Sequence, residues 1–142
     1  MWQSYLLYGQ TNPGQGAVYF QWDQKEGLAT WIDQNKGQVE VVGHSYGGDT
    51  AASVVANGHF VVSLVTIDPV SWIRPDFSAV VGNVGAWTNY NSTSGQFTFA
   101  NFIAFVGGAW GSGPRDFANR HTDVNNYDHA DIGYKCSGPS GC

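Results

Sequence analysis

The sequence predicts one α/β domain, in which a mostly parallel β-sheet carries helices on both faces. The length of 142 residues suits a single domain. Strand-like and helix-like segments alternate along the chain, which is the pattern of parallel sheets. One strand-like segment, Phe60–Ile67, is a continuous apolar run rich in β-branched residues, as expected for a strand covered on both faces.

Each element is predicted from its local composition. A loop rich in Gly, Asn and Pro at 9–14 ends the first strand. The helix at 26–35 carries apolar residues three and four positions apart, and Asn57-Gly58 ends the second helix. Strands are expected at Ser4–Tyr8, Ala17–Trp22, Val39–Val42, Phe60–Ile67, within Ala79–Tyr90 and at Phe117–Val124, and helices at Glu26–Asn35, Tyr46–Ala56 and Phe99–Trp110.

The net charge argues against nucleic-acid binding, and the length of the apolar runs argues against a membrane span. The chain has 6 Lys and Arg against 11 Asp and Glu, a net charge of −5, so it lacks the basic surface that nucleic-acid binding requires. Its apolar runs are shorter than the ~20 residues of a membrane span, so no integral membrane segment is expected. The composition leaves room for a dimer, although nothing in the sequence indicates one.

The two ends of the sequence support only open expectations. No secretory signal is visible at the start, which favours a cytosolic protein or a mature exported one. Cys136 and Cys142 are the only cysteines, six positions apart. A disulfide-closed loop and a flexible tail with two free thiols both fit residues 136–142.

The most informative motif is Gly43-His44-Ser45-Tyr46-Gly47, which matches G-x-S-x-G between a predicted strand and a predicted helix. A strand that turns sharply into a helix exposes the serine hydroxyl at the tip, and glycines are needed where the turn is crowded. The helix N-terminus adds N–H groups beside the serine oxygen. No Lys-Ser/Thr pair follows, and no G-x-G-x-x-G is present, which excludes a P-loop and a dinucleotide site.

The segment VVGHSYGGDTAA resembles the nucleophile elbow of serine lipases and esterases of the α/β-hydrolase superfamily. The resemblance extends, by order and spacing, from Tyr5 to about Ile132. It implies a minimal α/β-hydrolase fold and a serine esterase or lipase in which Ser45 forms an acyl-enzyme. It also implies a small-molecule or lipid ester as substrate, with no cofactor and no metal.

The family order of serine, acid and histidine limits the candidates for the acid. Asp68 follows the predicted strand at 60–67 and precedes Pro69, and TIDPV is similar to the IDP or LDP stretch of lipases. A turn-forming Asp before Pro is the structural alternative. No charged residue occurs from Phe77 to Pro114, so Asp68 is the preferred acid and Asp76 the weaker alternative.

Only His121 and His129 follow these acids in the chain. His129 lies in a polar segment after the last predicted strand, which is the type of loop that carries the family's histidine. His121 is expected in or beside that strand, so His129 is the preferred base. His44 is expected to pack or hydrogen-bond locally within the elbow, and His59 is expected at the surface.

An oxyanion formed during acyl transfer needs two backbone N–H donors. The family pattern assigns one to Tyr46, the residue after the serine. By resemblance the second is Gln10, in the loop after the first strand. The HG or HGGG form usual in the family is missing here.

Eight aromatic residues lie in the uncharged segment from Phe77 to Pro114. Most are expected in the core, and a minority are expected to line an apolar pocket. They are Phe77, Trp87, Tyr90, Phe97, Phe99, Phe102, Phe105 and Trp110.

Three alternative functions remain open at this stage. A thioesterase or an amidase would use the same three residues. A reduced hydrolase fold could instead bind a ligand or partner without catalysis. The acidic and histidine residues of HTDVNNYDHAD could bind a metal, but their spacing matches no zinc or calcium signature.

Overall fold

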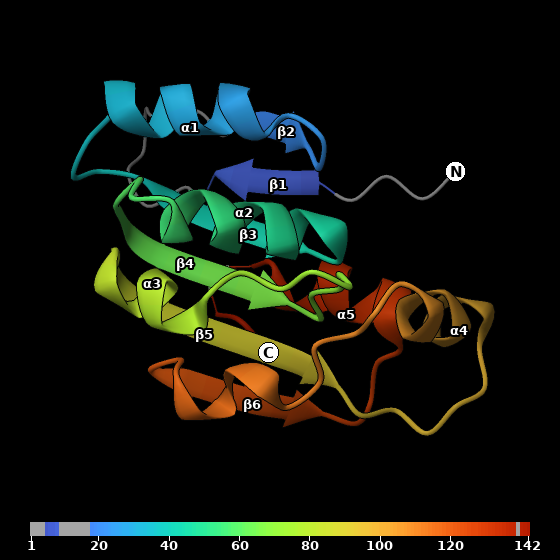
Figure 1. Cartoon of the computed structure of the whole chain (residues 1–142). Coiled ribbons are helices and arrows are strands. Elements are labelled where there is room, and N and C mark those ends of the chain that lie inside the picture. The colour runs from blue at the N-terminus through green and yellow to red at the C-terminus, as the bar shows by residue number, and fades with distance from the viewer. Residues whose placement is uncertain (1–4, 9–17, 139) are drawn as a thin grey trace.

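The computed structural model describes the backbone of residues 5–8, and residues 18–138 and 140–142 in full. These residues form one six-stranded sheet with helices packed against it (Figure 1). The strands are β1 (Tyr5–Tyr8), β2 (Tyr19–Gln21), β3 (Glu40–His44), β4 (Val61–Ile67), β5 (Val84–Ser92) and β6 (Arg120–Val124). The helices are α1 (Lys25–Gln34), α2 (Tyr46–Ala56), α3 (Phe77–Gly82), α4 (Phe99–Val106) and α5 (His129–Cys136), with a 3₁₀ turn at Gly113–Asp116.

The strand order is β2-β1-β3-β4-β5-β6. Strands β3 to β6 are parallel, whereas β1 pairs antiparallel with both β2 and β3. The carboxyl ends of the parallel strands therefore meet at one edge of the sheet, on the right of Figure 1, where α4 and α5 lie. The α/β class and the parallel core of the sheet are confirmed.

Two apolar clusters cover opposite faces of the sheet. On one face, α1, α2 and α3 pack against alternate strand residues such as Val41 and Leu64, with Trp87 fully buried among them. On the other face, Ile132 of α5 packs against Ile67 of β4. Because neighbouring strand residues point to opposite faces, the central strands β3, β4 and β5 each contribute to both clusters.

Helix α3 was not predicted, because its two valines give it the appearance of a strand. The Asp76 side chain caps it by accepting hydrogen bonds from the N–H groups of Ser78 and Ala79, at 2.8 and 3.4 Å. The strand predicted within 79–90 therefore begins only at Val84. Asp76, the weaker candidate for the acid, has a capping role.

Half of the eight aromatic residues at 77–114 are exposed, so the prediction that most of them lie in the core is wrong. Trp87, Tyr90 and Trp110 are buried, and Phe77 is partly buried against the core. The other four, Phe97, Phe99, Phe102 and Phe105, are between 48% and 95% exposed. Helix α4 also stops at Val106 rather than at residue 110, because Gly107 and Gly108 follow.

The segment after β6 is a helix, although a polar loop was expected. Asp128 caps α5 by accepting from the N–H groups of Ala130 and Asp131, each at 3.0 Å. A disulfide joins Cys136, at the end of α5, to Cys142. None of the helices in the described ranges is both long and apolar enough to cross a membrane.

Candidate active site

Ser45 lies alone between β3 and α2, at the sharp turn that the motif predicted. Its φ of 58° and ψ of −129° are strained for a residue with a side chain, which typically costs about 1–3 kcal/mol. A Cβ atom on Gly43 would lie 2.4 Å from the carbonyl oxygen of Gly47. Glycine at position 43 is thus required for the close approach of β3 and α2.

Backbone hydrogen bonds hold this turn in place. The Ser45 N–H donates to the Ile67 carbonyl of β4 at 3.0 Å, and the Ser45 carbonyl accepts from Gly48 N–H at 3.0 Å and from Val70 N–H at 3.3 Å. The serine backbone is therefore anchored to the neighbouring strand, to its own helix and to the segment after β4. These anchors offset the strain at Ser45.

Asp68 follows β4 directly and is also held in a left-handed conformation, with φ of 42°. Its N–H donates to the Tyr90 carbonyl at 2.7 Å, and its Oδ1 accepts from Ser92 N–H at 3.0 Å. The side chain is buried. Strand β5 therefore fixes both the backbone and one carboxylate oxygen, which leaves Oδ2 for another partner.

That partner is His129, the first residue of α5. Its Nδ1 lies 2.6 Å from Asp68 Oδ2, and its Nε2 lies 2.9 Å from Ser45 Oγ. All three side chains are buried. A chain of hydrogen bonds thus connects residues that are 84 and 61 positions apart in the sequence.

The direction of these hydrogen bonds follows from their partners. A carboxylate only accepts, so His129 Nδ1 carries the proton in this contact, and Nε2 is left to accept the hydroxyl proton of Ser45. This is the tautomer that a general base beside a nucleophilic serine requires. The preference for Asp68 and His129 over Asp76 and His121 therefore agrees with the geometry, while their catalytic roles remain predictions.

No family model, curated protein or solved structure matches this chain.

His121 lies in β6 and has other partners. Its Nδ1 is 3.1 Å from Asn89 Nδ2, and its Nε2 is 3.1 Å from Asp123 Oδ1. His59 is partly exposed and lies 2.9 Å from Asp33, which fits its expected surface position. Within the described ranges, no group of three or more His, Cys, Asp or Glu side chains is arranged to hold a metal ion.

Of the two predicted oxyanion donors, Tyr46 and Gln10, the structure describes only Tyr46. Tyr46 is the first residue of α2, where helices leave backbone N–H groups without an intrahelical acceptor. Its position directly after Ser45 is the one the motif requires. Gln10 lies outside the described residues.

Two contacts to the backbone of His129 were not predicted. His44, expected to pack or hydrogen-bond within the elbow, reaches the His129 carbonyl instead, and Asn101 of α4 reaches the His129 N–H. Asn101 lies in the uncharged segment and belongs to no motif. Nothing in the sequence alone links it to the site.

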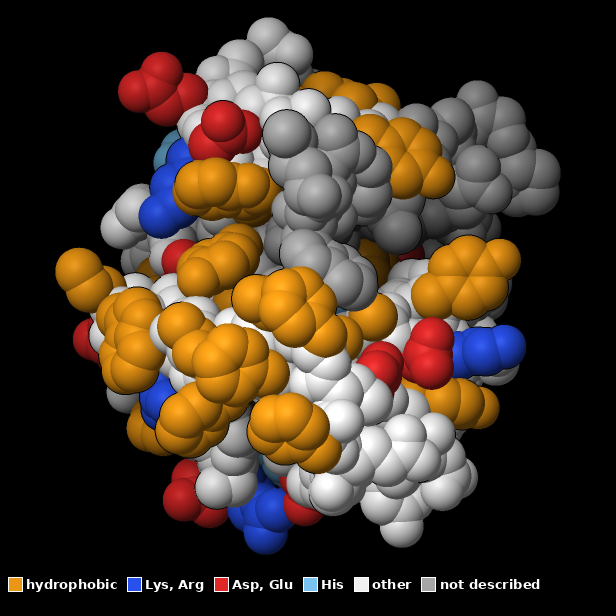
Figure 2. All heavy atoms as spheres, turned by 90° about the vertical axis from the view of Figure 1, so that its right-hand side faces the viewer, with side chains coloured by type: hydrophobic (Ala, Val, Ile, Leu, Met, Phe, Trp, Pro, Cys, Tyr) orange, Lys and Arg blue, Asp and Glu red, His pale blue; other side chains and the backbone are white. Residues whose placement is uncertain are grey.

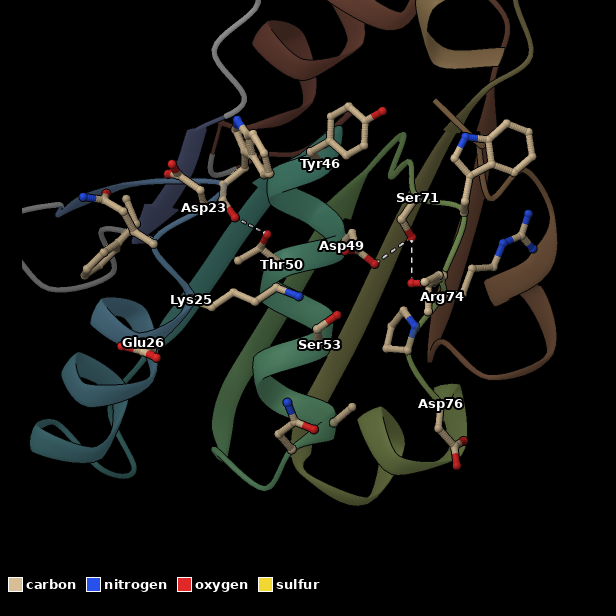
Figure 3. Close-up of a pocket in the computed structure, with 18 of the residues that line it drawn as sticks. Asp23, Lys25, Glu26, Tyr46, Asp49, Thr50, Ser53, Ser71, Arg74 and Asp76 are labelled. Atoms are coloured by element: carbon tan, nitrogen blue, oxygen red, sulfur yellow. Dashed lines mark hydrogen bonds between the residues drawn. The ribbon is translucent and has the colours of Figure 1, made fainter. Parts of the chain in front are cut away.

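A groove of about 1200 Å³ runs along the outer side of α2 and begins at Tyr46 (Figure 3). Its lining includes Tyr46 but not Ser45, Asp68 or His129, so the groove is separate from the hydrogen-bonded chain of three residues. Burial raises the pKa of Asp49 in this groove, and the hydroxyl of Ser71 donates to its Oδ1 at 2.7 Å.

Ser71 is expected to stabilise the fold around the elbow. Its hydroxyl also accepts from Trp110 Nε1 at 3.0 Å, so Ser71→Ala leaves the buried indole N–H and the Asp49 carboxylate without this partner. We expect the free energy of unfolding to fall by about 1–3 kcal/mol in urea denaturation. Ser53→Ala, in the same groove, is the matched control and should change it by less than about 0.5 kcal/mol. Equal effects of the two substitutions would contradict this role for Ser71.

Proposed function

We propose that this protein is a serine hydrolase of carboxylic esters, an esterase or lipase built on a minimal α/β-hydrolase fold. The observation that carries the proposal is the hydrogen-bonded chain from Ser45 Oγ through His129 to Asp68. The strained elbow supports it, because a serine held at φ 58° between a strand and a helix has the backbone geometry of a nucleophile elbow.

The proposed reaction begins when Ser45 Oγ attacks the ester carbonyl carbon. His129 Nε2 takes the hydroxyl proton and then gives it to the departing alkoxide, which leaves as an alcohol. The negative oxygen of the tetrahedral intermediate accepts a hydrogen bond from the N–H group of Tyr46, and the resemblance to lipases assigns the second donor to Gln10, outside the described residues. Water, deprotonated by His129, then attacks the acyl-enzyme; the bond between the acyl carbon and Ser45 Oγ breaks, His129 returns the proton to Ser45 Oγ, and the carboxylic acid is released.

Asp68 remains ionised throughout this reaction. It holds the Nδ1–H tautomer of His129 and stabilises the imidazolium that forms when Nε2 is protonated. Its contact with Ser92 N–H fixes the carboxylate so that Oδ2 faces the ring.

The exposed aromatic residues favour a substrate with an apolar acyl group. Hydrophobic side chains gather on the face that contains the carboxyl ends of the parallel strands (Figure 2). The exposed apolar side chains of the described residues include Phe99, Phe102 and Phe105 of α4, and Trp72 and Ile73 after β4. Exposed apolar groups gathered at one place mark sites that contact apolar partners.

The test combines a labelling reaction with a substrate series. A fluorophosphonate probe should label the wild-type protein covalently at Ser45, as located by peptide mass spectrometry, and should not label Ser45→Ala. Ser53→Ala should label as the wild type does. Hydrolysis of p-nitrophenyl esters from acetate to laurate should be measurable and should favour the longer acyl groups.

A folded wild-type protein that neither labels nor hydrolyses any of these esters would refute the proposal. Labelling without ester hydrolysis would instead lead to assays of thioesters and amides, which the same three residues could cleave. Labelling at a serine other than Ser45 would also refute the assigned nucleophile.

A further inference from the structure

The peptide groups of His129 are held on both sides by side chains from other elements. Its N–H donates to Asn101 Oδ1 of α4 at 2.9 Å. Its carbonyl oxygen lies 2.6 Å from His44 Nε2, at the end of β3. His129 begins α5, so its N–H is one of the donors that a helix leaves without an internal partner.

His44 can fill this role only as a donor, because a carbonyl oxygen only accepts. Burial, together with the nearby His129, lowers the pKa of His44 to about 4, so near neutral pH the ring is uncharged. The hydrogen bond then requires the tautomer with the proton on Nε2. The titratable groups that act on this ring are His129 on α5 and Asp68 after β4.

The close packing of α5 against His44 depends on Gly133. The two imidazole rings of His44 and His129 lie with their centroids 4.8 Å apart. One turn further along α5, a Cβ atom on Gly133 would lie 2.6 Å from Cγ and Nδ1 of the His44 ring. Any larger residue at position 133 would displace this ring or the helix.

Asn101 is fixed by its own partners. Its amide nitrogen Nδ2 donates to the Gln96 carbonyl at 2.7 Å and to the Ser94 carbonyl at 3.3 Å. These contacts orient the amide so that Oδ1 faces the His129 N–H. The two side chains that hold His129 therefore come from the elbow and from α4, which are separate in the sequence.

We propose that His44 and Asn101 are positioning residues that hold the backbone of His129, so that its ring stays in reach of both Ser45 and Asp68. This inference rests on the proposed function. Neither side chain touches the substrate or takes part in proton transfer. A displacement of about 1 Å in a reacting group can lower a rate about 100-fold, so two hydrogen bonds to the backbone of the base can affect catalysis strongly.

The test separates the hydrogen bond of His44 from the volume of its ring. His44→Met fills similar space without a donor, whereas His44→Gln keeps a donor at similar reach. We expect His44→Met to lower kcat for p-nitrophenyl ester hydrolysis about 10- to 100-fold with little change in KM, and His44→Gln to recover most of that loss. His59→Gln, at a histidine paired on the surface, is the control and should leave kcat unchanged.

Two further variants test the same geometry from α4 and α5. Asn101→Leu removes the acceptor and should lower kcat by a similar factor, whereas Asn101→Asp keeps an acceptor oxygen and should lower it less. Gly133→Ala should reproduce the effect of His44→Met. In the His44→Met background Gly133→Ala should add little, because the rigid ring it displaces is already gone.

A spectroscopic readout separates this inference from the proposed function. The Nδ1 proton of His129 in its contact with Asp68 should be observable by NMR as a slowly exchanging resonance, with or without catalysis. It should broaden or exchange faster in His44→Met and Asn101→Leu than in the wild type. A wild-type protein that shows this proton but hydrolyses no ester would refute the proposed function alone.

Two results would overturn the inference. One is that His44→Met and Asn101→Leu keep both the Nδ1 proton and the wild-type kcat. The other is that His44→Gln and His44→Met lose kcat equally, since the hydrogen bond would then have no separate role. If His44→Met fails to fold, the two Asn101 variants decide the outcome by the same criteria.

Discussion

Asp68→Asn is expected to lower kcat for ester hydrolysis about 10⁴-fold while the protein remains folded. The substitution changes one atom of the side chain and retains its size. It is also compatible with the backbone, because Asn tolerates the left-handed conformation that Asp68 adopts, with φ of 42°. The expected loss therefore reflects hydrogen bonding at His129 rather than unfolding.

The neighbours of Asp68 determine how the amide would lie. Ser92 N–H donates to Oδ1, so the amide oxygen must remain there and the NH₂ group must face His129 Nδ1. The ring can accept this hydrogen bond only if its own proton moves to Nε2. A protonated Nε2 cannot take the proton of Ser45, so the base is present in the wrong tautomer.

The measurement is kcat on a soluble p-nitrophenyl ester, with thermal unfolding to check the fold. Asp76→Asn is the matched control, since Asn caps a helix about as well as Asp and α3 should be preserved. We expect its kcat within about threefold of the wild type. If Asp76→Asn lost activity and Asp68→Asn kept it, the weaker candidate would be the acid and the assignment would be wrong.

Ser45 and Asp68 of the candidate site could be predicted from the sequence because each is tied to a local signal. Ser45 lies in a motif whose glycines indicate a crowded turn, and Asp68 follows a buried strand and precedes proline. In a parallel sheet, residues after adjacent strands lie close together, so Ser45 and Asp68 were expected to be neighbours. His129 followed from chain order, although the helix that carries it was not predicted.

The features that the sequence did not predict depend on contacts between distant segments, and local composition carries no signal of such contacts. Phe99, Phe102 and Phe105 have a helical spacing that fits either burial or exposure, and only the position of α4 beyond the edge of the sheet decides between them. Asn101 lies 28 positions before His129, with nothing around it to indicate a contact. Gly133 looks like an ordinary helix glycine until the His44 ring is seen against it.

Gly43→Ala is expected to destabilise the fold by about 3 kcal/mol or more, at the upper end of the cost of overpacking a core. The new Cβ would lie 2.4 Å from Gly47 O, 2.7 Å from Gly47 C and 2.8 Å from Gly48 Cα. All three are backbone atoms of the first turn of α2, so no side chain can rotate away. Relief requires β3 and α2 to separate.

Neither element is free to move. Gly43 pairs with β1 on one side and with β4 on the other, within the sheet. Helix α2 is packed through Ala51, Ala52 and Val55, each fully buried, so shifting it opens the core beneath it. The clash would therefore be relieved only by losing sheet hydrogen bonds or buried contacts, both of which stabilise the folded state.

Urea denaturation monitored by tryptophan fluorescence would measure this effect, with Gly82→Ala as the matched control. A Cβ atom at Gly82 meets nothing within 4 Å, so that variant should differ from the wild type by less than about 1 kcal/mol. Any folded Gly43→Ala protein should also lose fluorophosphonate labelling, because Ser45 would no longer be held at the tip of the turn. A Gly43→Ala variant as stable and as reactive as Gly82→Ala would mean that β3 and α2 do not meet as closely as the proposed nucleophile requires.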